Sequence, residues 1–248
     1  MKGIEKQRDI RVMGILNLTP DSFFAPSRHN LAILESGADM IDIGACSTRP
    51  GHKPVGAKEE WRRMKRTLAQ IRRDHPDLPL SIDSYWSEVV RRAYDLVGPF
   101  IVNDVTAGEA DPQMLSTVAE LGLTYIPMHH GPADNASDVL EWYRDFTSKA
   151  EYEGIRDWIL DPGFGFGKTV EQNFGVFHTL EQLREAGRPV LVGISRKRMV
   201  WMPLGLTPDT AGEATQRLHL EALERGADIL RVHDVAETLQ TIDRYRRE

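Results

Sequence analysis

Seven polar side chains directly follow short apolar runs of the sequence, where strands of a sheet would end. They are Asn17, Asp83, Asn103, His129, Asp161, Ser195 and His233. In folds that alternate strands and helices, residues that bind ligands gather at the carboxyl ends of the strands. Two carboxylates and two amides converging there would suit a flat, nitrogen-rich heterocycle, because a carboxylate accepts two parallel hydrogen bonds from an amino-amide edge. Taken singly, Asp83 or Asn103 could equally be a helix cap or an Asx-turn.

A glycine-rich loop, Asp161–Thr169 (DPGFGFGKT), follows the sixth apolar run. Alternate glycines let the backbone adopt positive φ and approach a ligand closely, and Phe166, with Met128, could pack on the face of a ring. The phosphate-binding loop pattern fails because Pro162 occupies the place of its first glycine, and the dinucleotide fingerprint fails because Lys168 replaces its third. We interpret the loop as one that presents its aspartate and its second aromatic ring; a plain strand-to-helix turn is the alternative.

A second cluster of candidate residues carries positive charge. The segment Ser195–Arg198 follows the seventh apolar run, and Arg231 and His233 end the eighth. In a (β/α)8 barrel the loops after strands seven and eight most often hold phosphate. Because cations at the start of a helix oppose its macrodipole, an anion site is favoured here over a solvated helix start.

Two further loops, Thr19–Phe24 and Ser47–Gly51, are rich in turn formers and hydroxyl groups, as either a mobile lid or plain surface loops would be. Cys46 has no base placed beside it by the sequence, so a small packed thiol is favoured over a nucleophile. The neighbours His129 and His130 lack carboxylates at metal-ligand spacing and give only a weak metal signal.

Eight apolar runs alternate with helical patterns and predict the elements that position these side chains. The predicted strands are Val12–Leu16, Met40–Ile43, Leu80–Ile82, Phe100–Val102, Tyr125–Met128, Trp158–Leu160, Val190–Ile194 and Ile229–Val232. The predicted helices are a short one at Leu31–Ser36, one with Trp61, Met64, Leu68 and Ile71 on one face, and those at Val89–Val97, Met114–Leu121, Val139–Tyr152, Phe174–Leu183, Thr210–Leu223 and Ala236–Tyr245. Asp111 before Pro112 is expected to cap a helix, and Thr169 with Gln172 to form a capping box.

Eight strand-helix units in 248 residues predict an α/β chain that folds as one (β/α)8 TIM barrel domain over residues 1–248, with a shortened first helix. A doubly wound open sheet with fewer strands is the alternative. The barrel is favoured because chemical residues end nearly every strand, whereas an open sheet would cluster them at one switch point.

The composition excludes several classes of protein. Hydrophobic residues at 41% and charged residues at 27% are typical of a globular protein, and a net charge of -6 gives no reason to expect nucleic-acid binding. No apolar run approaches the length of a membrane span, and the N-terminus lacks the apolar core of a signal peptide. A single cysteine agrees with a reducing compartment, so we expect a cytoplasmic protein without a membrane partner.

Ordered motifs along nearly the whole chain carry a family resemblance. They are Met13–Phe23 (MGILNLTPDSF), Ser47–Gly51 (STRPG), Ser81–Asp83 (SID), Val102–Asp104 (VND), Met128–His129, the glycine-rich loop, Gly193–Lys197 (GISRK) and Arg231–Val235 (RVHDV). In this order they make the chain resemble the dihydropteroate synthases of folate biosynthesis, which are pterin-binding TIM barrels.

This resemblance implies a transferase that condenses 4-aminobenzoate with 6-hydroxymethyl-7,8-dihydropterin diphosphate, giving 7,8-dihydropteroate and diphosphate. It also implies a magnesium ion (Mg2+) that accompanies the diphosphate, and a homodimer formed through the late helices. The pterin would be bound by Asp83, Asn103, Met128, Asp161, Phe166, Gly193 and Lys197. The diphosphate would be bound by Asn17, Thr48, Arg231 and His233, with Asn17 also reaching the metal. The aminobenzoate would be bound by Thr48, Arg49, Pro50, Phe166, Lys197 and Arg198, and the catalytic residues would be Lys197, Arg231, His233 and Asp83.

The chain departs from the family pattern at three places. Family members usually carry a glycine-rich, acidic first loop, where this chain has Phe24–His29; Arg198 stands where serine is frequent, and Ala45 replaces a glycine. Two alternative functions follow. One is a degenerate, non-catalytic pterin-binding protein, and the other is a methyltransferase barrel of the methyltetrahydrofolate type, against which the Ser47–Gly51 loop and the anion site argue.

Overall fold

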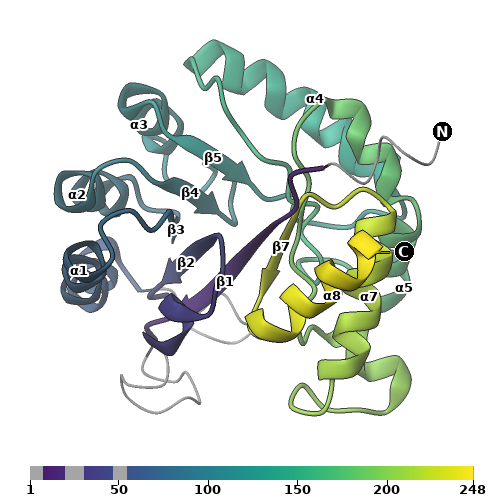
Figure 1. The fold of residues 1–248 in the computed structure, drawn as a ribbon. Coiled ribbons are helices and arrows are strands. Elements are labelled where there is room, and N and C mark those ends of the chain that lie inside the picture. The colour runs from purple at the N-terminus through teal and green to yellow at the C-terminus, as the bar shows by residue number, and fades with distance from the viewer. Residues whose placement is uncertain (1–7, 20–30, 47–54, 248) are drawn as a thin grey trace. The chain divides into compact units, whose positions relative to one another are not determined.

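The computed structural model describes residues 8–19, 31–46 and 55–247, which form an α/β fold built on a parallel sheet (Figure 1). The described strands are β1 (Arg11–Asn17), β2 (Met40–Gly44), β3 (Leu80–Asp83), β4 (Ile101–Asp104), β5 (Thr124–Pro127), β6 (Leu191–Val192) and β7 (Ile229–Val232). Their hydrogen-bonded order is β5-β4-β3-β2-β1-β7-β6.

Helices alternate with the strands along the chain. The α-helices are α1 (Ala57–Asp74), α2 (Ser87–Val97), α3 (Met114–Leu121), α4 (Ala136–Glu153), α5 (Val170–His178), α6 (Arg198–Trp201), α7 (Gly212–Glu224) and α8 (Val235–Arg247). The 3-10 helices are η2 (Leu31–Glu35), η3 (Leu180–Ala186) and η4 (Met202–Leu204). None of these described helices combines the length and the apolar character needed to cross a bilayer.

The chain divides into two compact units. Unit 1 contains the described residues of 1–14, 129–146 and 159–248, and unit 2 contains those of 15–128 and 147–158. The boundary passes through β1 after Gly14 and through α4 after Phe146. The single domain expected over the whole chain stays a prediction.

In unit 2, the strands β2 to β5 lie parallel beside one another, and α1, α2 and α3 form a layer along them (Figure 1). The predicted face of α1 is confirmed, since Met64, Leu68 and Ile71 are fully buried while Trp61 is half-buried. The register pairs Gly44 with Asp83. Asp83 in turn pairs with Asn103, so two predicted site residues end neighbouring strands.

In unit 1, β7 pairs in parallel with the first half of β1 and with β6. The apolar side chains of β6 and β7 are fully buried, and α7 packs against α8. Helix α5 begins with the predicted capping box, in which the Thr169 side chain accepts from the Gln172 backbone N–H and the Gln172 side chain accepts from the Thr169 backbone N–H. This box fixes the point at which the glycine-rich loop ends.

The sixth predicted strand, Trp158–Leu160, does not form a ladder. In the described residues it makes only isolated bridges, from Trp158 to Tyr125 and from Leu160 to Val190. The part of the chain that the structure describes therefore has seven strands where eight were predicted, and the complete (β/α)8 barrel is not confirmed.

Three helix predictions needed correction or refinement. The short first helix is the 3-10 helix η2, and the predicted Phe174–Leu183 helix is split into α5 and η3. Asp111 lies two residues before Gln113, the N-cap of α3, and its Oδ1 accepts from the Gln113 N–H at 2.9 Å, while its Oδ2 accepts from the backbone N–H and the hydroxyl of Ser87, the first residue of α2. The aspartate thus accepts a hydrogen bond beside the predicted helix start and also satisfies a free N–H at the start of α2.

Candidate functional site

The glycine-rich loop of unit 1 begins at Asp161, whose backbone is held on both sides. The Tyr143 hydroxyl, from α4, donates to the Asp161 carbonyl and accepts from its N–H, each at 2.9 Å. The same carbonyl accepts from the His129 backbone N–H at 2.9 Å, and the Asp161 carboxylate accepts from the Gly163 N–H at 2.8 Å. Because the residue is 7% exposed, these contacts give its carboxylate a fixed orientation.

Burial governs the electrostatics of Asp161. It raises the pKa of the carboxyl above its usual range, and the positive charges of Lys197, Arg231 and Lys168 oppose that rise. A buried carboxyl with three cations nearby is a candidate for ligand recognition, because such perturbed groups concentrate at functional sites.

Lys197 is the centre of this cluster. Its Nζ donates to the Phe164 carbonyl at 2.5 Å and lies 4.8 Å from the centroid of the Phe166 ring. A Cβ atom at Gly193 would lie 3.9 Å from Lys197 Nζ and 3.8 Å from Arg231 Cβ. Unit 1 therefore brings together five of the predicted site residues, on the loop, after β6 and in β7. These five are Asp161, Phe166, Gly193, Lys197 and Arg231.

The remaining members of the predicted anion cluster have different environments. Ser195 Oγ lies 3.1 Å from His233 Nδ1 and accepts from the His233 backbone N–H, so these two predicted residues are adjacent. Arg196, with a left-handed φ of 56°, forms two hydrogen bonds to the Asp234 carboxylate, at 2.6 and 3.0 Å. Its guanidinium is thus committed to a protein partner, which the sequence interpretation missed.

Arg198 is exposed at the start of α6, and its Nε donates to the Met202 sulfur at 3.1 Å. No described contact links it to Phe166 or Lys197, so its predicted role with aminobenzoate stays a prediction. Thr48, Arg49 and Pro50 lie outside the described residues.

Unit 2 holds the other predicted polar residues. Asn103 is buried, and its Nδ2 donates to Asp42 Oδ2 at 3.0 Å. Asp83 is half-buried, and a Cβ at Gly44 would lie only 3.3 Å from its side chain, so the neighbouring strand leaves room for the carboxylate. Met128 is 2% exposed, while Asn17 is half-buried at the end of β1.

Glu60 on α1 is a functional candidate that the sequence interpretation missed. Its side chain is 0% exposed, and its carboxyl interacts with the Ser84 side chain. Burial raises the pKa of this carboxyl to about 7; a hydrogen bond with Ser84 opposes the rise, and the charge of Asp83 adds to it. A carboxyl that changes its protonation near neutral pH therefore lies close to Asp83, a predicted pterin-binding residue.

The buried Glu60 carboxyl gives a testable prediction about stability. Its folded-state pKa of about 7 lies above the ordinary value of 4.5, so folding favours the protonated acid. Its contribution is fully present below pH 4.5 and is lost as the pH rises through about 7, a change of about 3 kcal/mol in the free energy of unfolding. We expect Glu60→Gln to remove this loss, which urea unfolding at pH 5 and pH 8 measures.

The matched control for this prediction is Glu151→Gln, on an exposed position of α4. If Glu60→Gln and the wild type lose the same free energy of unfolding between pH 5 and pH 8, Glu60 does not hold a proton in the folded state.

Cys46 and His129, two weaker candidates of the sequence analysis, both contact other side chains of the protein. Cys46 Sγ lies 3.3 Å from the Tyr85 hydroxyl, which agrees with a packed thiol. His129 Nδ1 lies 3.0 Å from Lys168 Nζ, so this nitrogen has a protein partner. Burial, with the Lys168 charge second, lowers the pKa of His129 to about 4, and the ring is neutral at pH 7.

The donor set fits magnesium only as a companion of a substrate. Magnesium takes oxygen ligands and often binds through one or two protein groups together with substrate phosphates. Within residues 8–19, 31–46 and 55–247, no group of three or more His, Cys, Asp or Glu side chains could hold a metal. The side-chain oxygen of Asn17 suits a single protein ligand to an ion that arrives with diphosphate.

Comparisons with known proteins agree on one family. Residues 13–233 match the model of the pterin binding enzymes. The dihydropteroate synthase of Clostridium beijerinckii is 36% identical over 244 residues, which cover 91% of this chain and 89% of that protein. The Xanthomonas albilineans dihydropteroate synthase, solved with 4-aminobenzoic acid, is 37% identical with a TM-score of 0.90, covering 98% of this chain and 93% of that one. The enzyme of Clostridium difficile, solved in the presence of pteroic acid, is 35% identical with a TM-score of 0.86, covering 97% and 96%.

Proposed function

The chain belongs to the dihydropteroate synthases, a family of pterin-binding transferases, and we propose that it condenses 4-aminobenzoate with 6-hydroxymethyl-7,8-dihydropterin diphosphate. The products are 7,8-dihydropteroate and diphosphate. The observation that carries this proposal is the arrangement around Lys197, whose ammonium lies over the Phe166 ring and in the field of the buried Asp161 carboxyl.

The reaction is a substitution at the methylene carbon of the pterin. The carbon–oxygen bond to diphosphate breaks first, and the electron-rich dihydropterin stabilises the resulting methylene cation. The bond pair leaves with diphosphate, so the protein must chiefly stabilise negative charge on the leaving group. Arg231 and His233 have this role, as cation and as hydrogen-bond donor; magnesium, when bound with diphosphate, would neutralise further charge.

Asp161 and Lys197 orient the pterin in this proposal. The Asp161 carboxylate accepts from the amino-amide edge of the ring, and Lys197 donates to an acceptor beside it. Gly193 lies beside both cations, since a Cβ there would be at ordinary contact distance from Lys197 and Arg231, and in this proposal it faces the ring. Asp83 and Asn103 would provide further polar contacts with the pterin and Met128 an apolar one, while Asn17 would hold diphosphate and a magnesium ion bound with it.

The aromatic amine is the nucleophile. Its neutral nitrogen attacks the methylene cation and then loses a proton, which restores a neutral amine in the product. Phe166 and Lys197 line the aminobenzoate side, with Arg198 as the proposed partner of its carboxylate and Thr48, Arg49 and Pro50 as the closing loop. Excluding water matters here because water would otherwise capture the cation.

Two finer features complete the proposal. We propose that the sheet belongs to a complete (β/α)8 barrel in which the Trp158–Leu160 segment takes the place of the missing strand, because its bridges join it to β5 and to the residue before β6. We also propose a homodimer formed through the late helices, as the family resemblance implies.

A two-substrate assay of diphosphate release tests the proposed function. With both substrates and magnesium, we expect steady release of diphosphate. Omitting magnesium should slow the release, and omitting 4-aminobenzoate should reduce it to slow hydrolysis. Tight binding of the pterin diphosphate in calorimetry, without any release after long incubation, would contradict the proposal and favour a degenerate binding protein.

A further inference from the structure

Lys168 lies inside the glycine-rich loop, although neither the sequence motifs nor the proposed reaction gives it a role. Its Nζ lies 3.0 Å from His129 Nδ1, 3.2 Å from the Gly163 carbonyl oxygen and 3.4 Å from the Phe166 carbonyl oxygen. An ammonium group has three protons to donate, and three acceptors surround it. All its donors are therefore used within the protein.

The glycines of the loop make this arrangement possible. Gly163, Gly165 and Gly167 have φ values of 66°, 83° and 69°, which turn the chain around the lysine. A Cβ at Gly167 would lie 2.7 Å from the backbone of Gly131, so the loop is also packed closely from outside. The loop backbone thus has a strongly curved conformation, which contacts with side chains outside the glycines must stabilise.

Different contacts hold different parts of the loop. Its start, Asp161, is fixed by Tyr143 and by the His129 backbone. In its middle, Gly165 donates to the Asn173 side chain at 2.6 Å, and the Phe166 carbonyl reaches Lys168. Removing the lysine would therefore remove the side-chain contacts of the Gly163 and Phe166 carbonyls, while Asp161 and Gly165 keep theirs.

The acceptor for Lys168 is itself well placed. His129 is 4% exposed, and its ring packs edge-on against Trp142 with 5.4 Å between centroids. When the ring is neutral and Nε2 carries the hydrogen, Nδ1 can accept a hydrogen bond from the Lys168 ammonium. The histidine thus acts as a fixed acceptor for the lysine, which gives it a use other than metal binding.

We propose that Lys168 is a positioning residue that closes the glycine-rich loop from within and so fixes the Phe166 ring for the aromatic amine substrate. The ammonium donates to His129 Nδ1 and to the carbonyl oxygens of Gly163 and Phe166. The inference rests on the proposed function in naming that substrate, whereas the loop closure itself concerns the protein without ligands.

Hydrogen–deuterium exchange of the substrate-free protein tests the closure. In Lys168→Met we expect the amides of residues 163–167 to exchange at least about tenfold faster, the factor that the loss of one charge-assisted hydrogen bond corresponds to. The rest of the chain should exchange as in the wild type, as should the whole chain of the control Lys149→Met. Unchanged exchange of the loop in a folded Lys168→Met protein would overturn the proposal.

A second variant covers the case in which Lys168→Met does not fold. Lys168→Arg keeps the charge and N–H donors, but its planar group cannot place three protons at the same points. Its loop amides should exchange faster than those of the wild type and more slowly than those of Lys168→Met. Loop exchange equal to that of the wild type would contradict the closure.

Steady-state kinetics separate positioning from a direct ligand role. Because Asp161 is anchored independently, Lys168→Met should raise KM for 4-aminobenzoate about tenfold and change KM for the pterin diphosphate less than about threefold. A rise confined to the pterin diphosphate would identify Lys168 as a phosphate ligand and overturn the proposal. If the wild-type protein makes no product but the loop of Lys168→Met exchanges faster, the proposed function is wrong and the loop closure is still supported.

Discussion

Replacing Lys197 with alanine is expected to lower kcat/KM for condensation by at least about 100-fold. Removing one preorganised electrostatic contact commonly costs about 2.7–4 kcal/mol in the barrier. Lys197 also donates to the Phe164 carbonyl and lies over the Phe166 ring, so its loss disturbs the loop as well as the charge. Initial rates with each substrate varied in turn measure the effect.

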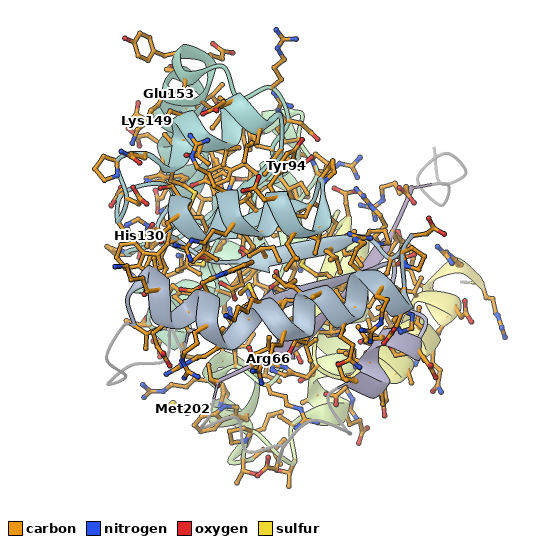
Figure 2. All side chains as sticks on the ribbon, turned by 90° about the vertical axis from the view of Figure 1, so that its left-hand side faces the viewer. Arg66, Tyr94, His130, Lys149, Glu153 and Met202 are labelled. Carbon is orange, nitrogen blue, oxygen red and sulfur yellow. The ribbon has the colours of Figure 1, made fainter. Side chains whose placement is uncertain are left out.

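The matched control is Lys149→Ala. Lys149 is exposed on α4, near Glu153 (Figure 2), and is expected to leave kcat/KM unchanged within about twofold. If a folded Lys197→Ala protein retained kcat/KM within about threefold of the wild type, the ammonium would not act on the reacting ligands, and the proposed site would be wrong.

Asp161→Asn is expected to lower kcat/KM by roughly 100-fold, mainly through a higher KM for the pterin diphosphate. Two charge-assisted hydrogen bonds to an amino-amide edge are each worth roughly 1.5–3 kcal/mol, and the asparagine side chain turns one acceptor into a donor that faces another donor. The oxygen that accepts from the Gly163 N–H can remain in place, so the loop should keep its conformation.

KM for each substrate, measured separately, tests this expectation. Asp145→Asn on the exposed side of α4 serves as the control and should behave as the wild type. A normal KM for the pterin diphosphate in Asp161→Asn, or an increase only for 4-aminobenzoate, would show that Asp161 does not recognise the pterin.

Local patterns predicted much of the fold because they depend on neighbours in the sequence. The spacing of Met64, Leu68 and Ile71 identified the buried face of α1, and the Thr169–Gln172 capping box identified the start of α5. The Trp158–Leu160 run makes isolated bridges and not the predicted ladder, because a ladder depends on partners far along the chain. Short apolar runs carry no information about those partners.

The site was predicted in part for the same reason. The glycine-rich loop, Lys197 and Arg231 stood out through their motifs, whereas Tyr143 is an ordinary buried aromatic on α4 until the fold brings it to the Asp161 backbone. Asp42 and Glu60 gave a usable signal: a carboxylate within a buried apolar run or on a buried helix face needs an explanation.

Arg196 and Lys168 are two cations whose motifs suggested a role that their contacts do not support. Each lies in a motif and looks like an anion ligand, yet their contacts are with Asp234 and with the loop carbonyls. Charge alone does not distinguish a cation that binds a ligand from one that holds the protein.

The most direct measurement of the central claim is the identity and amount of the product. The protein is incubated with 6-hydroxymethyl-7,8-dihydropterin diphosphate, 4-aminobenzoate and magnesium, and dihydropteroate is quantified by mass spectrometry beside the released diphosphate. We predict one 7,8-dihydropteroate for each diphosphate released, and none when 4-aminobenzoate is omitted. Diphosphate released without dihydropteroate, or no product from a protein that binds both substrates, would contradict the claim that this chain is a dihydropteroate synthase.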